Sequence, residues 1–161
     1  QVIITYPNND LGGLDLIKEL NIFYKKFKSK NIRLIKSLGQ TNFYSLMSLN
    51  KNKICKITMV GNSSAGIKET PFFGVPTINI GDRQKGRLRA ENVIDLSFDK
   101  DKIVSAIINS FRNNEFRQKC LKIKNPYFKK HSSKLMVDVI SKINIDEKLF
   151  NKKFVDRLTN E

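Results

Sequence analysis

The sequence predicts an α/β fold in which a parallel sheet carries helices on both faces. Short apolar segments rich in isoleucine and valine alternate with longer segments whose apolar residues recur at helical spacing. Loops containing glycine, asparagine and serine separate these segments. This alternation is typical of parallel strands joined by crossover helices. The 161 residues suffice for one domain with a good core.

The individual elements follow in chain order from these patterns. The expected strands are residues 2–6, 32–35, 54–60, 77–80 and 92–96. The expected helices are residues 14–29 and 41–49, with mainly helical sequence from residue 99 onward. We expect the first strand to be buried. We also expect the first helix to place its apolar face, with Tyr24 and Phe27, in the core.

The chain is expected to divide near residue 145. Residues 1–145 form the folded domain, and residues 146–161 form a charged C-terminal helix with a thin apolar stripe of Leu149, Phe150, Phe154 and Leu158. Such a stripe needs a partner surface. Because the chain starts inside a strand and without a methionine, we expect a missing N-terminal domain, on which this helix packs.

The formal net charge of +15 would ordinarily favour a polyanionic partner. The cations are 23 lysines and seven arginines, and lysine, asparagine and isoleucine together account for 59 residues. This bias indicates a compositional drift across the whole chain rather than an arginine-lined groove. No nucleic-acid recognition motif is present. We therefore expect no nucleic-acid partner.

The cysteines, the single histidine and the hydropathy pattern exclude several other classes of site. No apolar run approaches the length of a membrane span, and the first residues lack the pattern of a signal peptide. Cys55 and Cys120 have neither CxxC nor metal-ligand spacing, which favours reduced thiols in the cytoplasm. His131 has no second ligand at metal spacing and is expected at the surface. We expect no membrane partner, no metal site and no cofactor.

A glycine- and serine-rich stretch, residues 61–66, follows the third expected strand and is called here the serine turn. Ser63 or Ser64 is suited to cap the helix that follows, and Gly61 and Gly66 allow a sharp turn and the close approach of a ligand. Because the first N–H groups of a helix lack internal partners, such a turn can bind phosphate. Taken alone, the stretch fits an ordinary capped turn better than a phosphate site.

Residues after the serine turn add a carboxylate and several cations that are expected to lie near the turn. Glu69 lies within two helical turns, near enough to accept hydrogen bonds from vicinal ribose hydroxyls, and Thr70 and Pro71 are expected to end the helix early. The next strand runs into residues 81–89, called here the cationic loop, which holds four cations including Arg83. In a parallel sheet both loops open at the carboxyl edge, where α/β proteins usually bind ligands.

Three motifs in this region resemble the hydrolysing UDP-N-acetylglucosamine 2-epimerases: GNSSAGIKE at residues 61–69, GVPTINIG at 74–81 and DRQKGR at 82–87. The resemblance continues more weakly through residues 6–10, 37–39 and 125–127. Non-hydrolysing epimerases share the fold but differ in these motifs. At residues 128–130 the chain has Phe-Lys-Lys where the family has Gly-Asp-Gly, which puts in doubt what that turn contributes.

The resemblance implies a Rossmann-like C-terminal half of a two-domain, glycosyltransferase-B-type fold. The family's nucleotide site is implied at Ser63, Ser64, Ala65, Gly66, Glu69 and Arg83. The hydroxyls, N–H groups and guanidinium would hold the diphosphate, and Glu69 the ribose. Asn8 and Asp10 are implied to line the cleft.

The family reaction is elimination of UDP from UDP-N-acetylglucosamine, followed by hydration to N-acetylmannosamine. The family supplies the acid and base mostly from its N-terminal half, so we expect no catalytic residue here and no turnover by this segment alone. The implied partners are a UDP-sugar, the missing N-terminal domain and further copies in a homo-oligomer.

Three alternatives stay open. The substrate can be a UDP-2,4-diacetamido-trideoxyhexose, which offers the same nucleotide contacts. The chain can be a nucleotide-sugar-binding module without turnover. It can also be a basic nucleic-acid binder, with an affinity that falls steeply with salt and does not depend on Arg83.

Overall fold

The structure, a computed structural model, describes residues 1–8 and 10–151 and confirms a Rossmann-like α/β fold. The strands are β1 (Val2–Thr5), β2 (Ile32–Ile35), β3 (Met59–Gly61), β4 (Thr77–Ile80) and β5 (Val93–Leu96). The α-helices are α1 (Gly13–Lys26), α2 (Gly39–Lys51), α3 (Ala65–Lys68), α4 (Lys100–Arg112), α5 (Asn114–Lys122), α6 (Ser132–Ile140) and α7 (Glu147–Phe150). A 3-10 helix, η1 (Thr70–Phe73), follows α3. The chain forms two compact units, one ending at Pro126 and one starting at Tyr127.

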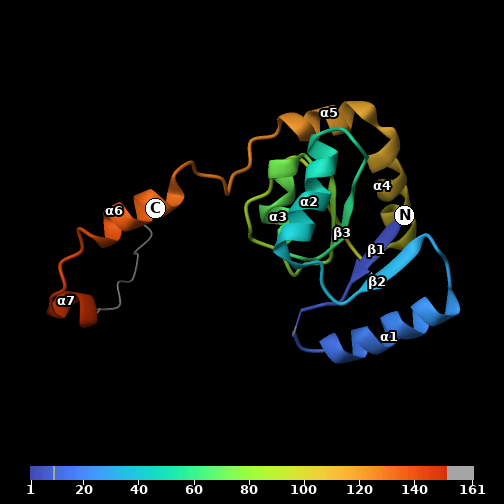
Figure 1. The fold of residues 1–161 in the computed structure, drawn as a ribbon, viewed down its shortest axis with the longest axis horizontal. Coiled ribbons are helices and arrows are strands. Elements are labelled where there is room, and N and C mark those ends of the chain that lie inside the picture. Colours follow the sequence, from blue (N-terminus) through green and yellow to red (C-terminus); the bar gives the residue numbers. More distant parts are fainter. Residues whose placement is uncertain (9, 152–161) are drawn as a thin grey trace, which may run out of the picture. The chain divides into compact units, whose positions relative to one another are not determined.

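All strand pairs in the first unit are parallel. β1 pairs with β2, and β4 pairs on one side with β3 and on the other with β5. α2 and α3 lie on one side of the three-stranded sheet and α4 on the other, as Figure 1 shows. Within residues 1–8 and 10–151 no ladder joins the two sheets, so the strands form two parallel sheets rather than one.

The third strand begins later than the sequence indicates, at Met59 instead of residue 54. Two features of the preceding segment explain the difference. Lys53 has a left-handed backbone with φ 59°, which an extended strand does not tolerate. The Ile57 N–H donates to the Asn50 side chain over 3.2 Å, so it does not join a strand ladder. Residues 52–58 therefore form a loop that leads into β3.

The prediction that β1 and the aromatic residues of α1 are buried is wrong. Val2 and Ile3 are 52% and 40% exposed, and Tyr24 and Phe27 are 37% and 50% exposed. β1 has β2 as its neighbour in the sheet, and α1 packs mainly against β2. The ring of Phe27 instead packs on Phe23, with centroids 4.8 Å apart.

The core of the first unit lies between α2 and the chain around β3 and β4. Met47, Phe73 and Val75 form its buried centre, and Ile57 and Met59 pack against them from the β3 side. The η1 segment contributes through Phe73 because Thr70 and Pro71 end α3 after one turn, as predicted. Gly66, at the end of the serine turn, is itself buried.

The two thiols of the first unit differ in accessibility. Cys55 is exposed, while Cys120 is fully buried in α5, where burial raises the pKa of its thiol to about 11. Since the thiolate is the reactive form, we expect one thiol to react rapidly with Ellman's reagent at pH 8 in the native protein. Denaturant should release the second. Rapid reaction of two native thiols, or of one in Cys55→Ser, would contradict this assignment.

The second unit carries α6 and α7. Up to Phe150, the large apolar side chains of its helices and of the segment between them are exposed: Leu135, Met136, Val137, Val139, Ile140, Ile143, Ile145, Leu149 and Phe150. His131 is exposed as predicted. Phe154 and Leu158 of the predicted apolar stripe lie outside the described residues. In the part of the chain that the structure describes, no helix is both long enough and apolar enough to span a bilayer.

Candidate functional site

The serine turn leaves β3 at Gly61 and enters α3, which is only one turn long. Gly61 has φ 140°, a backbone conformation that favours glycine. Because four residues align few peptide dipoles, the helix macrodipole contributes little here. What the turn offers an anion is therefore its individual hydrogen-bond donors.

Some of these donors are already used within the turn. The Ala65 N–H donates to Ser63 Oγ over 3.3 Å, and the Gly66 N–H donates to the Ser63 carbonyl over 3.1 Å. Ser64 occupies the N-cap position, but its side chain makes no capping bond. Among the described residues, no acceptor is bonded to the N–H groups of Ser63 and Ser64. The hydroxyls and these two N–H groups are therefore among the donors that remain for a ligand.

A buried hydroxyl and amide network fixes the base of the serine turn. Thr70 Oγ1 donates to the Gly66 carbonyl over 2.7 Å and lies 2.7 Å from Thr77 Oγ1. Asn92 Nδ2 donates to the same Thr70 oxygen over 3.0 Å. A Cβ atom on Gly66 would lie 2.8 Å from Thr77 Cγ2. The turn is therefore held against β4, at a distance that only glycine permits.

The cationic loop meets the serine turn at the Asn62 carbonyl. Arg83 Nη1 donates to this oxygen over 3.1 Å, and Gln84 Nε2 donates to it over 2.7 Å. Gln84 is only 1% exposed, whereas the Arg83 side chain is 40% exposed. Because β3 and β4 are parallel neighbours, their following loops lie side by side. The structure thus brings Arg83 to the residue that precedes Ser63.

Asp10, in the loop after β1, also reaches this place. Its Oδ2 atom lies 2.5 Å from Arg83 Nη2, an ion pair that joins the loops after β1 and β4. Asn8 is exposed, and in the described part of the chain its side chain makes no hydrogen bond. The Glu69 side chain is half-buried with its carboxylate unbonded within residues 1–8 and 10–151. Of the two predicted cleft residues, Asp10 contacts Arg83.

Gln84 and the Asn62 carbonyl are the parts of this arrangement that sequence reasoning missed. A buried glutamine inside a loop of charged residues has no periodic pattern that would reveal it. Gln84 Oε1 and Asn79 Oδ1, at the end of β4, are buried with no hydrogen-bond partner among the described residues. Asn79 Nδ2 donates to Asp95 over 2.6 Å, and Asp95 is paired with Arg89 at 2.5 Å. These contacts join Arg89, at the end of the cationic loop, to strands β4 and β5.

Neither of the two cavities described in the structure is lined by the serine turn or by Arg83, although the second includes Arg89 at the end of the cationic loop. One is lined by residues of the loop before β3 and of α5, the other by residues of the β5 approach and the end of α5. Within the described residues no group of three histidine, cysteine or acidic side chains is placed to hold a metal ion. The polar groups that the structure brings together here are the serine turn's hydroxyls and N–H groups, Arg83, Gln84 and the Asp10 carboxylate.

Comparison with known proteins identifies similar sequences among the 2-epimerases. The profile of the UDP-N-acetylglucosamine 2-epimerase family matches residues 1–141. The chain is 41% identical over 117 residues to a GDP/UDP-N,N'-diacetylbacillosamine 2-epimerase (hydrolyzing) of Campylobacter jejuni. It is 33% identical over 147 residues to the polysialic acid biosynthesis protein P7 of Escherichia coli. It is 36% identical over 106 residues to a UDP-N-acetylglucosamine 2-epimerase of Neisseria meningitidis.

The matched regions cover 73%, 89% and 66% of this chain, but they span only 28%, 35% and 26% of the respective relatives. The chain thus corresponds to about a third or less of each relative. The profile match nevertheless extends over nearly all of it, including the serine turn and the cationic loop. This chain belongs to the UDP-N-acetylglucosamine 2-epimerase family.

Proposed function

We propose that this chain is the UDP-binding portion of a hydrolysing 2-epimerase that acts on UDP-N-acetylglucosamine. The single observation that carries the proposal is the contact of Arg83 with the Asn62 carbonyl. It holds a cation beside Ser63 and Ser64, whose N–H groups make no hydrogen bond within the described residues. Charge-assisted hydrogen bonds to a diphosphate are stronger than neutral ones, so this group of donors suits a pyrophosphate.

The Asp10 carboxylate supports the same assignment. Its oxygen lies 2.5 Å from Arg83 Nη2, which means that an anionic oxygen already occupies one position on the guanidinium. A diphosphate oxygen has the same charge and the same hydrogen-bonding preference. When UDP binds, its diphosphate takes over this position on Arg83. Glu69, at the end of α3, accepts hydrogen bonds from the ribose hydroxyls.

In the proposed reaction, this site stabilises the negative charge that develops on the departing UDP. The bond between the sugar C1 and the diphosphate oxygen breaks while the C2 proton is removed, which gives an unsaturated sugar that water then hydrates. Arg83 and the serine hydroxyls act on the leaving group, where such electrostatic stabilisation is most effective. The proton-transfer groups come from a part of the enzyme outside this chain.

We further propose that the segment is the C-terminal portion of a longer, homo-oligomeric enzyme of the cytoplasm, which needs no cofactor. The short share of each relative that the chain spans supports the greater length, and the other features follow from the family resemblance. The exposed apolar side chains of α6, together with Leu149 and Phe150, give the missing domain a surface on which to pack.

A second substrate is favoured by a specific observation. A relative that is 41% identical bears a name that includes a diacetylbacillosamine nucleotide, with GDP or UDP. The serine turn and Arg83 contact only the diphosphate in this proposal, so they do not distinguish these sugars. Product analysis with the whole enzyme separates N-acetylmannosamine from its diacetamido counterpart, and titration with GDP as well as UDP tests the base.

The test of the nucleotide site is a calorimetric titration of this chain with UDP. Arg83→Gln and Ser64→Ala should each weaken UDP binding about tenfold, because each removes a hydrogen bond to a charged group. Arg87→Gln is the matched control, since Arg87 is an exposed cation of the same loop. UDP binding no tighter than that of inorganic sulfate would contradict the proposal, as would equal effects of Arg83→Gln and Arg87→Gln.

A further inference from the structure

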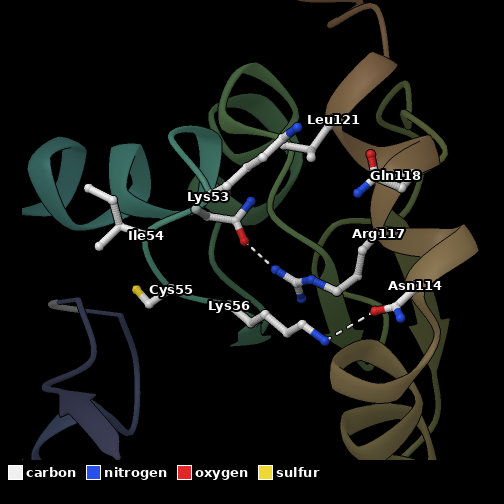
Figure 2. Close-up of a pocket in the computed structure, with 9 residues that line it drawn as sticks. Lys53, Ile54, Cys55, Lys56, Asn114, Arg117, Gln118 and Leu121 are labelled. Atoms are coloured by element: carbon white, nitrogen blue, oxygen red, sulfur yellow. Dashed lines mark hydrogen bonds between the residues drawn. The ribbon is translucent and has the colours of Figure 1, made fainter.

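The cavity before β3, called here the cationic pocket, has a volume of about 270 Å³. Its lining residues come from the end of α2, the loop leading to β3 and α5: Asn50, Lys53, Ile54, Cys55, Lys56, Asn114, Arg117, Gln118 and Leu121. Figure 2 shows the Arg117 side chain extending from α5 toward that loop. The lining contains three cations and no carboxylate.

Arg117 is the buried cation of the pocket, with 8% of its surface exposed. Its guanidinium donates to the Ser110 carbonyl over 2.8 Å, to Asn50 Oδ1 and, over 3.4 and 3.5 Å, to the Ile57 carbonyl. In the described residues none of its partners is a carboxylate. Burial lowers its pKa, and the groups that oppose this effect are two thiols rather than acids. Buried charges in proteins are normally paired, so this cation lacks a counter-ion.

The two lysines of the pocket add to this uncompensated charge. Lys56 Nζ donates to the Phe111 carbonyl over 2.9 Å and to Asn114 Oδ1 over 3.2 Å, both of which are neutral acceptors. The Lys53 ammonium makes no hydrogen bond or ion pair within residues 1–8 and 10–151. The second cavity differs in this respect, because its Lys119 is paired with Glu91 at 2.8 Å.

We propose that the cationic pocket binds the phosphate group of a small phosphorylated molecule. A phosphate dianion would supply the missing counter-charge to Arg117 and accept hydrogen bonds from Lys53 and from the Asn114 and Gln118 amides. The volume is below the usual range for drug-sized ligands, roughly 300 to 1,000 Å³, and suits a small anion rather than a nucleotide sugar.

This pocket is separate from the proposed nucleotide site. Its loop precedes β3 and the serine turn follows β3, so the two lie at opposite ends of a three-residue strand. Such a strand spans about 10 Å. Phosphate binding at the cationic pocket therefore does not depend on the proposed function. An experiment can disprove the pocket without disproving the nucleotide site, and the reverse.

The test is a titration of the 15N-labelled chain with inorganic phosphate, followed by amide chemical shifts, against sodium chloride at matched ionic strength. We expect saturable shifts at residues 53–56 and 114–118, including the side-chain amides of Asn114 and Gln118. Shifts confined to residues 62–66 and Arg83, shifts spread over surface lysines generally, or equal shifts with chloride would overturn the proposal.

Lys53→Asn is the most informative variant, because asparagine tolerates the left-handed backbone that Lys53 adopts. It should weaken phosphate binding about tenfold, since a charged hydrogen bond is lost. Lys30→Asn makes the same charge change at an exposed position outside the pocket and should leave the affinity within about twofold. Equal affinities of Lys53→Asn and wild type would overturn the proposal, and so would equal losses in the two variants.

Discussion

Gly74→Ala is expected to lower the free energy of unfolding by about 3 kcal/mol or more, through backbone strain and overpacking together. Gly74 ends η1 with φ 62°, a left-handed conformation that alanine adopts only at a cost. A Cβ atom there would lie 2.8 Å from Leu121 Cα and 3.1 Å from the Cys120 carbonyl oxygen. Both are backbone atoms of α5, so no side-chain rotation relieves the clash.

Gly86→Ala separates these two causes. Gly86 has a similar φ of 79°, but no atom lies within 4 Å of the position that its Cβ would take. This variant should therefore cost only the strain, about 1 kcal/mol. Urea denaturation of both variants measures the difference. Equal losses would show that α5 moves away from η1 freely, which would contradict the close packing described here.

Asn50→Ala should destabilise the first unit by about 3 kcal/mol or more, because it leaves several buried polar groups unsatisfied. Asn50 is 4% exposed, and its Nδ2 donates to the carbonyls of Phe73 and Gly74 over 3.1 and 2.9 Å. Its Oδ1 accepts from Ile57 N–H over 3.2 Å and from Arg117. One amide thus joins α2, η1, the β3 loop and α5.

Asn52→Ala is the control for this change. Asn52 lies two residues later, at the end of α2, and is exposed. Its replacement should change the unfolding free energy by less than about 0.5 kcal/mol, as expected at a surface position. Thermal and urea denaturation of the two variants give the comparison. If the two variants have the same free energy of unfolding, water satisfies the hydrogen bonds that Asn50 makes in the wild type. Asn50 would then not hold these elements together.

The parallel α/β class and most element positions could be predicted because they depend on local patterns. Alternation of apolar and helical segments indicates parallel strands and the position of most elements along the chain, and Thr70 and Pro71 end α3 early as predicted. The start of β3 could not be predicted, because Ile57 is apolar yet its N–H is bonded to a side chain seven residues earlier. Hydropathy does not record such a contact.

The burial of β1 and α1 was predicted wrongly for a related reason. Apolar periodicity indicates which face of an element avoids water, but it does not indicate what covers that face. Tyr24 and Phe27 are on the expected helix and are nevertheless exposed.

At the candidate site, the order of the motifs in the sequence predicts that the serine turn and Arg83 belong to one site. The contacts of Arg83 and buried Gln84 with the Asn62 carbonyl could not be predicted, because they depend on the three-dimensional structure. The nucleotide contacts themselves stay a prediction.

The close approach of Gly66 to β4 means that residues 66 and 77 share one small volume. The methyl group of Thr77 fills the space that an alanine side chain at 66 would need, while the Thr77 hydroxyl is bonded to Thr70. An alanine at residue 66 is therefore compatible with a serine at residue 77, because serine keeps the hydroxyl and lacks the methyl group. The two positions are constrained to change as a pair, although they lie eleven positions apart in the sequence.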